Sequence, residues 1–291
     1  MRTFTKITLL TTITFAFAFT SDQAEIYYQK GLKNLYGHQY IQAIGDFTNA
    51  ISLKRDFGDA YFQRAKSKDL LGKQAGFFST DLCYDLISAI KYGNDSATDM
   101  LREKSTVQCH SIKSMQHEPD LVFCADFSSS VLSSMPTGSD QLHFISYLNL
   151  FDNRFEEFPS EVLGYKYLLH LDVSSNSLTT LPEDINKMSW LTELNVNKNR
   201  IASLPTTLFQ LKELKQLYLR SNELTTISAQ VSHLKDLEEL DLGLNDIKTL
   251  PEEIKQLTNL KKLILVGNPM SEAYVKQLQK EMPNTKIFFH Q

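Results

Sequence analysis

The chain has 291 residues, of which 42% are hydrophobic and 22% are charged, and this composition excludes a disordered or collagen-like protein and allows one or two cores. Its formal net charge of -4 leaves no basic excess to neutralise phosphates, so we expect no nucleic-acid partner. Its three cysteines are too few for a scaffold built on disulfides.

The first predicted element is a signal peptide at residues 1–20. Arg2 and Lys6 precede an apolar run from Ile7 to Phe19, and small residues end it. The run is shorter than the roughly 20 apolar residues that cross a bilayer, so we expect cleavage and no stable membrane span afterwards. The chain would then be exported, as a periplasmic, cell-surface or secreted protein. The alternative is a buried N-terminal helix or strand, and an uncleaved N-terminus would favour a cytosolic signalling adaptor.

Residues 22–106 have the apolar spacing of helices. Gly31, Ala43, Phe47 and Ala50 are spaced like the small and aromatic residues at which two antiparallel helices meet closely, and a looser second copy follows. The pattern resembles the tetratricopeptide-repeat family, which implies an all-α domain. We expect a long inter-helix loop around Gly72–Ser79 in the second copy and a closing helix after it. A generic bundle of three or four helices is the alternative.

Residues 107–120 are expected to form a linker and an N-terminal cap. The only local cluster of metal-ligand residue types, Cys109 to Cys124 with two histidines and a glutamate between them, lacks the paired spacing of a zinc site. We therefore expect no metal and no cofactor. A disulfide between Cys109 and Cys124 and two reduced thiols both fit the sequence.

Residues 121–269 repeat at a step of 23 residues. The repeat is marked by a series of asparagines, each inside the same frame of apolar residues: Asn153, Asn176, Asn199, Asn222, Asn245 and Asn268. The frame resembles the leucine-rich-repeat family in its 23-residue class. The resemblance implies coils that each hold one short strand and one sharp turn, stacked into an α/β solenoid or horseshoe.

Each repeated asparagine is expected to bond backbone groups of its own turn and of the neighbouring coil, because these buried groups would otherwise stay unpaired. Both ends of a solenoid need caps, since the end coils would expose their core. A degenerate coil around Ser130 begins the array. Residues 270–291 are expected to close it with a helix at Ala273–Met282 and a strand at Ile287–Phe289.

The sequence carries no P-loop, GxGxxG, GxSxG, HExxH or kinase motif set, so we expect no enzyme and no catalytic residues. The predicted fold is an α/β leucine-rich-repeat solenoid preceded by an all-α tetratricopeptide-like segment. Family resemblance implies a scaffold that binds a protein or peptide without naming the partner. A cell-envelope adhesin for glycan or matrix is the alternative.

The expected binding surface is the concave face, onto which the strand residues between the core positions point. Exposed aromatic and arginine side chains are enriched at binding hot spots. Strand alternation puts Tyr218 and Arg220 on the same outward face. The candidate partner-binding residues on the concave columns are Tyr147, Asn149, Phe151, His170, Asp172, Glu193, Asn195, Asn197, Tyr218, Arg220 and Asp241.

Overall fold

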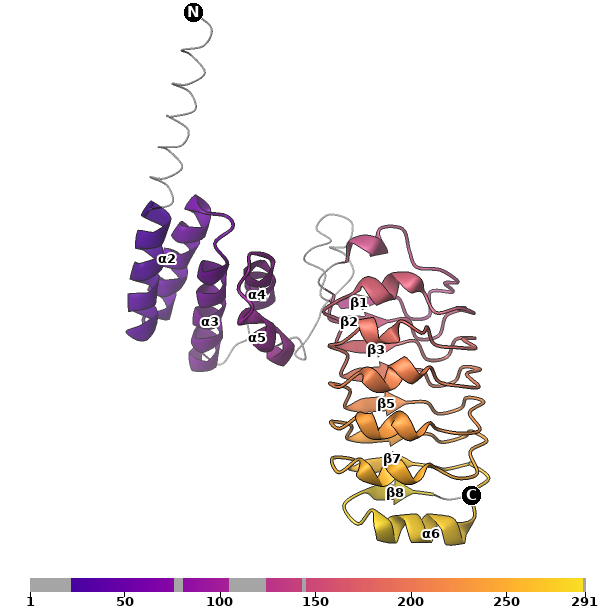
Figure 1. Cartoon of the computed structure of the whole chain (residues 1–291). Coiled ribbons are helices and arrows are strands. Elements are labelled where there is room, and N and C mark those ends of the chain that lie inside the picture. The colour runs from indigo at the N-terminus through magenta and orange to yellow at the C-terminus, as the bar shows by residue number, and fades with distance from the viewer. Residues whose placement is uncertain (1–21, 76–80, 105–123, 143–144, 290–291) are drawn as a thin grey trace, which may run out of the picture. The chain divides into compact units, whose positions relative to one another are not determined.

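The structure is a computed structural model that describes residues 22–75, 81–104, 124–142 and 145–289. The chain divides into two compact units, Met1–Gln108 and Cys109–Gln291 (Figure 1). The expected signal peptide and the expected linker lie outside the described residues, and so does Cys109. The choice between a disulfide and two thiols therefore stays untested. No helix among the described residues is long and apolar enough to cross a membrane.

All the regular secondary structure described in the first unit is helical. Its helices are residues 22–36, α2 (Tyr40–Leu53), α3 (Gly58–Ala75), α4 (Asp81–Lys91) and α5 (Ala97–Lys104). Each of α2, α3 and α4 packs against the helix that follows it in the chain. The loop expected from Gly72 onward is wrong at its start, because α3 continues to Ala75. Gly72 is buried within α3, so it is a packing position and does not break the helix.

The first two helices meet at the small residues that the sequence singled out. A Cβ atom on Gly31 would lie 2.6 Å from the Phe47 ring, so only glycine fits there. Ala43, Phe47 and Ala50 are fully buried. This close approach agrees with the packing that the tetratricopeptide resemblance implies.

A buried carboxylate joins residues 22–36 to α2. The side-chain amide of Asn34 donates to Asp46 Oδ2 at 2.6 Å, and Lys30 Nζ lies 3.0 Å from Asp46 Oδ1. Asp46 is nearly inaccessible to solvent, whereas Lys30 is largely exposed. The first helical pair therefore buries a carboxylate with one neutral and one exposed cationic partner.

The second helical pair, α3 and α4, repeats this arrangement with stronger charges. Asp85 of α4 is fully buried and lies 2.6 Å from Arg64 Nη2 and 2.9 Å from Lys68 Nζ, both on α3. Arg64 stands 34 residues after Lys30 in the sequence. The cations and the carboxylates Asp46 and Asp85 thus hold corresponding places in the two pairs, which is consistent with the expected repeat.

The second unit contains, within its described residues, one parallel sheet with a strand from every coil (Figure 1). In sheet order the strands are β1 (Cys124–Asp126), β2 (Tyr147–Asn149), β3 (His170–Asp172), β4 (Glu193–Asn195), β5 (Gln216–Tyr218), β6 (Glu239–Asp241), β7 (Lys262–Ile264) and β8 (Lys286–Phe288). Leu148 pairs with Leu171 and Leu171 with Leu194, which keeps the 23-residue register. The predicted solenoid fold is confirmed.

Short helical segments line the other side of the coils. These are η3 (Ser139–Gln141), η4 (Ser160–Gly164), η5 (Ile185–Lys187), η6 (Thr206–Gln210), η7 (Ala229–His233), η8 (Glu252–Gln256) and, in the last coil, α6 (Glu272–Glu281). The middle residue of each coil's strand is buried against them, as Leu171 is in β3, while its two neighbours face outward. The core is therefore a continuous stack of leucines between sheet and helical segments.

The repeated asparagines from Asn153 to Asn268, which we name the asparagine ladder, make the predicted hydrogen bonds. Asn199 Oδ1 accepts the backbone N–H of Leu178 in the preceding coil at 3.0 Å. Its Nδ2 donates to the carbonyl oxygens of Val173 at 3.1 Å and Val196 at 3.0 Å. The residue before each asparagine takes a left-handed backbone conformation, with φ 53° at Lys198, and this makes the turn sharp. Each amide thus joins two coils.

The helix and the strand expected at the C-terminal end lie within one residue of their expected bounds. Ser271 Oγ accepts the backbone N–H of Tyr274 at the start of α6, as helix-capping serines do. Val275 and Leu278 are buried in the solenoid core. The Tyr274 hydroxyl accepts the backbone N–H of Leu250 at 2.9 Å, which ties the cap to the preceding coil.

Candidate binding face

Because the register is the same between all neighbouring strands, outward-facing residues at equivalent positions form columns across the sheet. Neighbouring side chains in a column lie about 4.8 Å apart. The central column pairs Asp172 with Asn195, Asn195 with Tyr218 and Tyr218 with Asp241, as the sequence predicts. The leading column holds the first residue of each strand, and the trailing column holds the residue two positions after the central one. All the predicted site residues lie on these three columns.

Most of the central column is engaged with the backbone. The side chains of five of its members accept the N–H of the residue two positions ahead: Asp126 from Ser128, Asn149 from Phe151, Asp172 from Ser174, Asn195 from Asn197, and Asp241 from Gly243. Aspartate and asparagine commonly end a strand with such a turn. These side chains therefore have a structural role, whatever else they do.

Tyr218 breaks this rule. Its side chain cannot accept the N–H of Arg220 in this way, and that N–H instead donates to Asn197 Oδ1 in the neighbouring coil, at 2.6 Å. The Tyr218 ring is half-buried, and its hydroxyl makes no hydrogen bond within the part of the chain that the structure describes. The turn therefore does not need a tyrosine here, because Asn197 of the neighbouring coil accepts the Arg220 N–H that Tyr218 cannot accept.

Gly243 makes room for the side chain of Arg220. A Cβ atom on Gly243 would lie 2.8 Å from Arg220 Nη1 and 3.1 Å from Asp241 Oδ1. Arg220 Nη1 lies 4.0 Å from Asp241 Oδ2, and its guanidinium makes no hydrogen bond to any residue that the structure describes. The Asp241 carboxylate therefore orients the Arg220 guanidinium, whose N–H groups are available to hydrogen-bond a ligand. Gly243 was not among the predicted site residues, although it is the one glycine in its column.

Asp241 differs from the sequence prediction. It was expected as an exposed contact residue, but only 7% of its surface is accessible. The Gly243 N–H donates to it at 2.8 Å and the Arg220 guanidinium covers it. Burial raises the pKa of Asp241 above its ordinary value, against the opposing effects of Gly243 and Arg220. Its place in the site is to position Arg220.

Carboxylates surround the Tyr218 ring. Burial is the main cause that raises the pKa of Tyr218 to about 12, and the negative charges of Glu239, Glu193 and Asp241 add to it. Gln216, two residues before Tyr218, pairs with Glu193 on one side and Glu239 on the other. We name the group formed by Glu193, Asn195, Asn197, Tyr218, Arg220, Glu239, Asp241 and Gly243 the Tyr218 patch.

The remaining predicted residues form a second group on β2 and β3. The ring centroids of Tyr147 and His170 lie 6.2 Å apart, and His170 Nδ1 lies 3.0 Å from Glu193 Oε2. Phe151 is 39% exposed. Because β2 and β5 are three strands apart, about 14 Å separates Tyr147 from Tyr218. The contact between His170 and Glu193 joins this group to the Tyr218 patch, so the predicted residues spread along the face as one continuous row.

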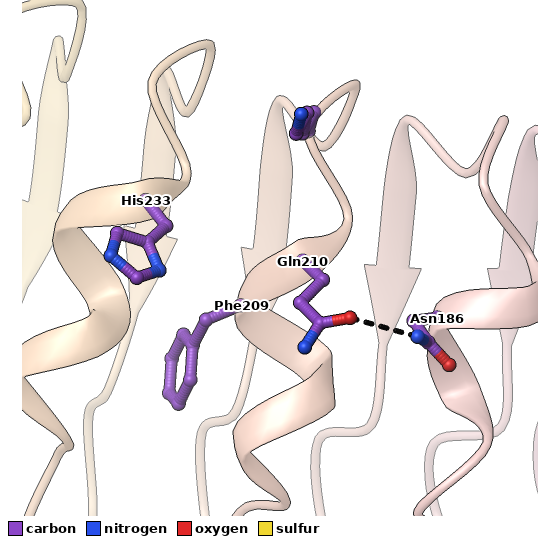
Figure 2. Close-up of a pocket in the computed structure, with 5 residues that line it drawn as sticks. Asn186, Phe209, Gln210 and His233 are labelled. Atoms are coloured by element: carbon purple, nitrogen blue, oxygen red, sulfur yellow. Dashed lines mark hydrogen bonds between the residues drawn. The ribbon is translucent and has the colours of Figure 1, made fainter.

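The opposite side of the coils holds a shallow depression of about 440 Å³ over η5, η6 and η7. It is lined by Asn186, Phe209, Gln210, Lys212 and His233. Figure 2 shows the Asn186 amide bonded to Gln210, with a donor–acceptor distance of 2.8 Å, and the rings of Phe209 and His233 beside them. Its charged and polar groups do not converge, and the described residues contain no cluster that could hold a metal ion. The concave face remains the stronger candidate.

A family model described as a leucine-rich repeat region matches residues 167–286. A search of curated proteins finds no match. A solved leucine-rich-repeat protein of Leptospira interrogans is 34% identical, with a TM-score of 0.51 over 58% of this chain and 49% of that chain. An internalin of Listeria monocytogenes is 16% identical, with a TM-score of 0.48 over 62% of this chain and 60% of that chain.

The chain thus spans about half the length of the Leptospira structure. The family model begins inside the third coil and reaches the last strand, so it covers most of the regular repeats. Register, asparagine ladder and family match agree. The solenoid of this chain therefore has the leucine-rich-repeat fold, and its residues 167–286 match the leucine-rich-repeat family model.

Proposed function

We propose that the chain is a non-enzymatic binding module that holds a protein or peptide on the Tyr218 patch. The observation that carries the proposal is a coordinated departure from the repeat. A tyrosine replaces the turn-forming Asp or Asn, Asn197 supplies the missing bond, and Gly243 clears space for Arg220. A coil that served only the fold would need none of these changes.

The side chains of the patch suit recognition. Tyrosine gives a large contact area at a small cost in conformational entropy, and tyrosine and arginine are the residue types most enriched at binding hot spots. Asn195 and Asn197 lie beside Tyr218 and Arg220 and form a polar border. The patch therefore combines an aromatic anchor, a directed cation and a hydrogen-bonding rim.

The test begins with the partner captured by the mature chain from its native organism. In calorimetry, Tyr218→Ala with Arg220→Ala should weaken its binding by at least about 2 kcal/mol, because truncation of central anchors typically costs that much. The control, Lys212→Ala with Lys235→Ala, changes two exposed lysines outside the concave columns and should bind nearly as wild type. Wild-type affinity of the concave variant together with failure of the control would place binding on the other side.

We further propose that this module acts outside the cytoplasm after removal of its first 18 to 21 residues. The support is the basic start, apolar run and small residues of the N-terminus. Intact-mass measurement of protein from the native organism should find a chain that begins near Asp22. A mass that includes Met1 would contradict export by this route and favour an adaptor inside the cell.

A further inference from the structure

We infer that the Tyr218 patch takes a basic side chain, a lysine or arginine of the partner, on the face of the Tyr218 ring between Glu193 and Glu239. This inference rests on the proposed function and adds the chemistry of the partner. It follows from three observations: the geometry of the ring, the balance of charge around it and the absence of a cation over it.

The geometry places the ring beside both glutamates. Glu193, Gln216 and Glu239 are directly paired across β4, β5 and β6. Tyr218 follows Gln216 by two residues and points to the same side of the sheet. Diagonal neighbours of this kind lie about 7 Å apart at their Cα atoms, which is within the reach of a tyrosine or glutamate side chain. The ring and the two carboxylates therefore share one short stretch of the concave face.

The charge around the ring is acidic. On the three columns from β3 to β7, the carboxylates are Asp172, Glu193, Glu239 and Asp241, and the permanent cations are Arg220 and Lys262. Lys262 bonds Glu239 through Oε1 at 2.7 Å, and His170 contacts Glu193 through Oε2 at 3.0 Å. Each glutamate thus keeps one oxygen that these contacts do not use. The excess of carboxylates favours an incoming cation over an incoming anion.

The Tyr218 ring lies under no lysine or arginine of the described residues. Elsewhere in the described chain Lys286 Nζ lies 4.8 Å from the centroid of Phe288, and Arg64 lies 5.5 Å from that of Tyr61. No described lysine or arginine lies over Tyr218, although Arg220 is only two residues away. Asp241 and the space above Gly243 hold Arg220 to one side. The electron-rich face of the ring is thus left for a cation from outside.

The experiment is a selection from a random-peptide library on the full chain, with counter-selection on the Tyr218→Ala variant. The peptides that remain should share a lysine or arginine, and its replacement by glutamine should weaken binding at least about tenfold. Glu193→Gln with Glu239→Gln should weaken it by a similar factor. Tyr218→Phe should keep binding within about threefold, because the ring face is retained, whereas Tyr218→Leu should lose it.

The matched control is Glu183→Gln with Glu157→Gln, which changes the net charge equally at exposed positions off the concave columns. The selected peptides should bind this control variant as they bind the wild type. Peptides that depend on Tyr218 but are acidic, or that ignore the Glu193 and Glu239 changes, would overturn the basic-side-chain inference and leave the proposed binding site standing. A selection that yields no peptide dependent on Tyr218 or Arg220 would overturn both.

Discussion

The two units of this chain bury polar groups in opposite ways. The solenoid uses a neutral amide, and each copy bonds backbone groups of its own coil and the coil before it, as Asn199 does with Val196 and Leu178. The helical unit uses charges, and each buried carboxylate is satisfied within its own helical pair, as Asp85 is by Arg64 and Lys68. The amides link each coil to the next, whereas both carboxylates are satisfied inside their own helical pair, although Arg64 also donates to Thr48 on α2.

The two arrangements differ in how far the effect of a mutation extends. Burying a neutral amide costs little free energy when all its hydrogen bonds are made, and its loss leaves backbone groups unpaired in two coils at once. A buried ion pair adds little net stability when intact, but the loss of one partner leaves an uncompensated charge in one place. We therefore expect defects in the solenoid to be shared between coils and defects in the helical unit to be severe and local.

One side chain allows the two units to be followed separately. Trp190 is the single tryptophan of the chain and lies in the solenoid, where its ring packs edge-on against Tyr167 with centroids 5.0 Å apart. Its fluorescence therefore reports unfolding of the solenoid. Far-UV circular dichroism at the helical minimum reports mainly the first unit, which holds most of the described α-helix.

The largest expected effect is that of Asp85→Ala. It leaves Arg64 and Lys68 without their buried carboxylate, and such a change costs about 3 to 5 kcal/mol. Urea denaturation should show loss of the helical signal at much lower denaturant, with the Trp190 transition unchanged. Gln29→Ala is the control, because it breaks an exposed side-chain hydrogen bond to Glu25 worth about 1 kcal/mol. Equal effects of the two variants would contradict the charge-based account of this unit.

A smaller effect is expected from Asn199→Leu in the solenoid. The change removes the acceptor of the Leu178 N–H and the donor to two carbonyls, so the free energy of unfolding should fall by about 1 to 3 kcal/mol. The midpoint of the Trp190 transition measures it. Asn186→Leu, at an amide bonded only to exposed Gln210, should shift that midpoint little. An unchanged midpoint for Asn199→Leu would refute the ladder.

The smallest effect on stability is expected from Tyr218→Asn, which restores the repeat's own residue type. An asparagine here can accept the Arg220 N–H as Asn195 accepts that of Asn197, so the free energy of unfolding should stay equal or rise by up to about 1 kcal/mol. Partner binding, measured by calorimetry, should nevertheless fall as far as with Tyr218→Ala. A clear loss of stability would mean that the tyrosine serves the fold.

The sequence predicts the solenoid and its columns because one period of 23 residues is repeated without a break from Asn153 to Asn268. The asparagine bonds follow from burial alone. The hydrogen bond from the Arg220 N–H to Asn197 and the space above Gly243 could not be predicted, since they depend on how far a side chain reaches into the next coil. The helical boundary after Gly72 was missed for a related reason, because tertiary packing decides whether a glycine breaks a helix.

The coil-to-coil bonding of the asparagine ladder also has a consequence for ancestry. Because each coil is bonded to its immediate neighbours through the same few groups, a segment of one coil's length is a unit that gene duplication can add or delete without altering any other coil. The Tyr218 patch depends on the side chains of β4, β5 and β6 together. Descendant arrays can therefore grow or shrink on either side of this block of three coils and keep the surface that we propose for binding.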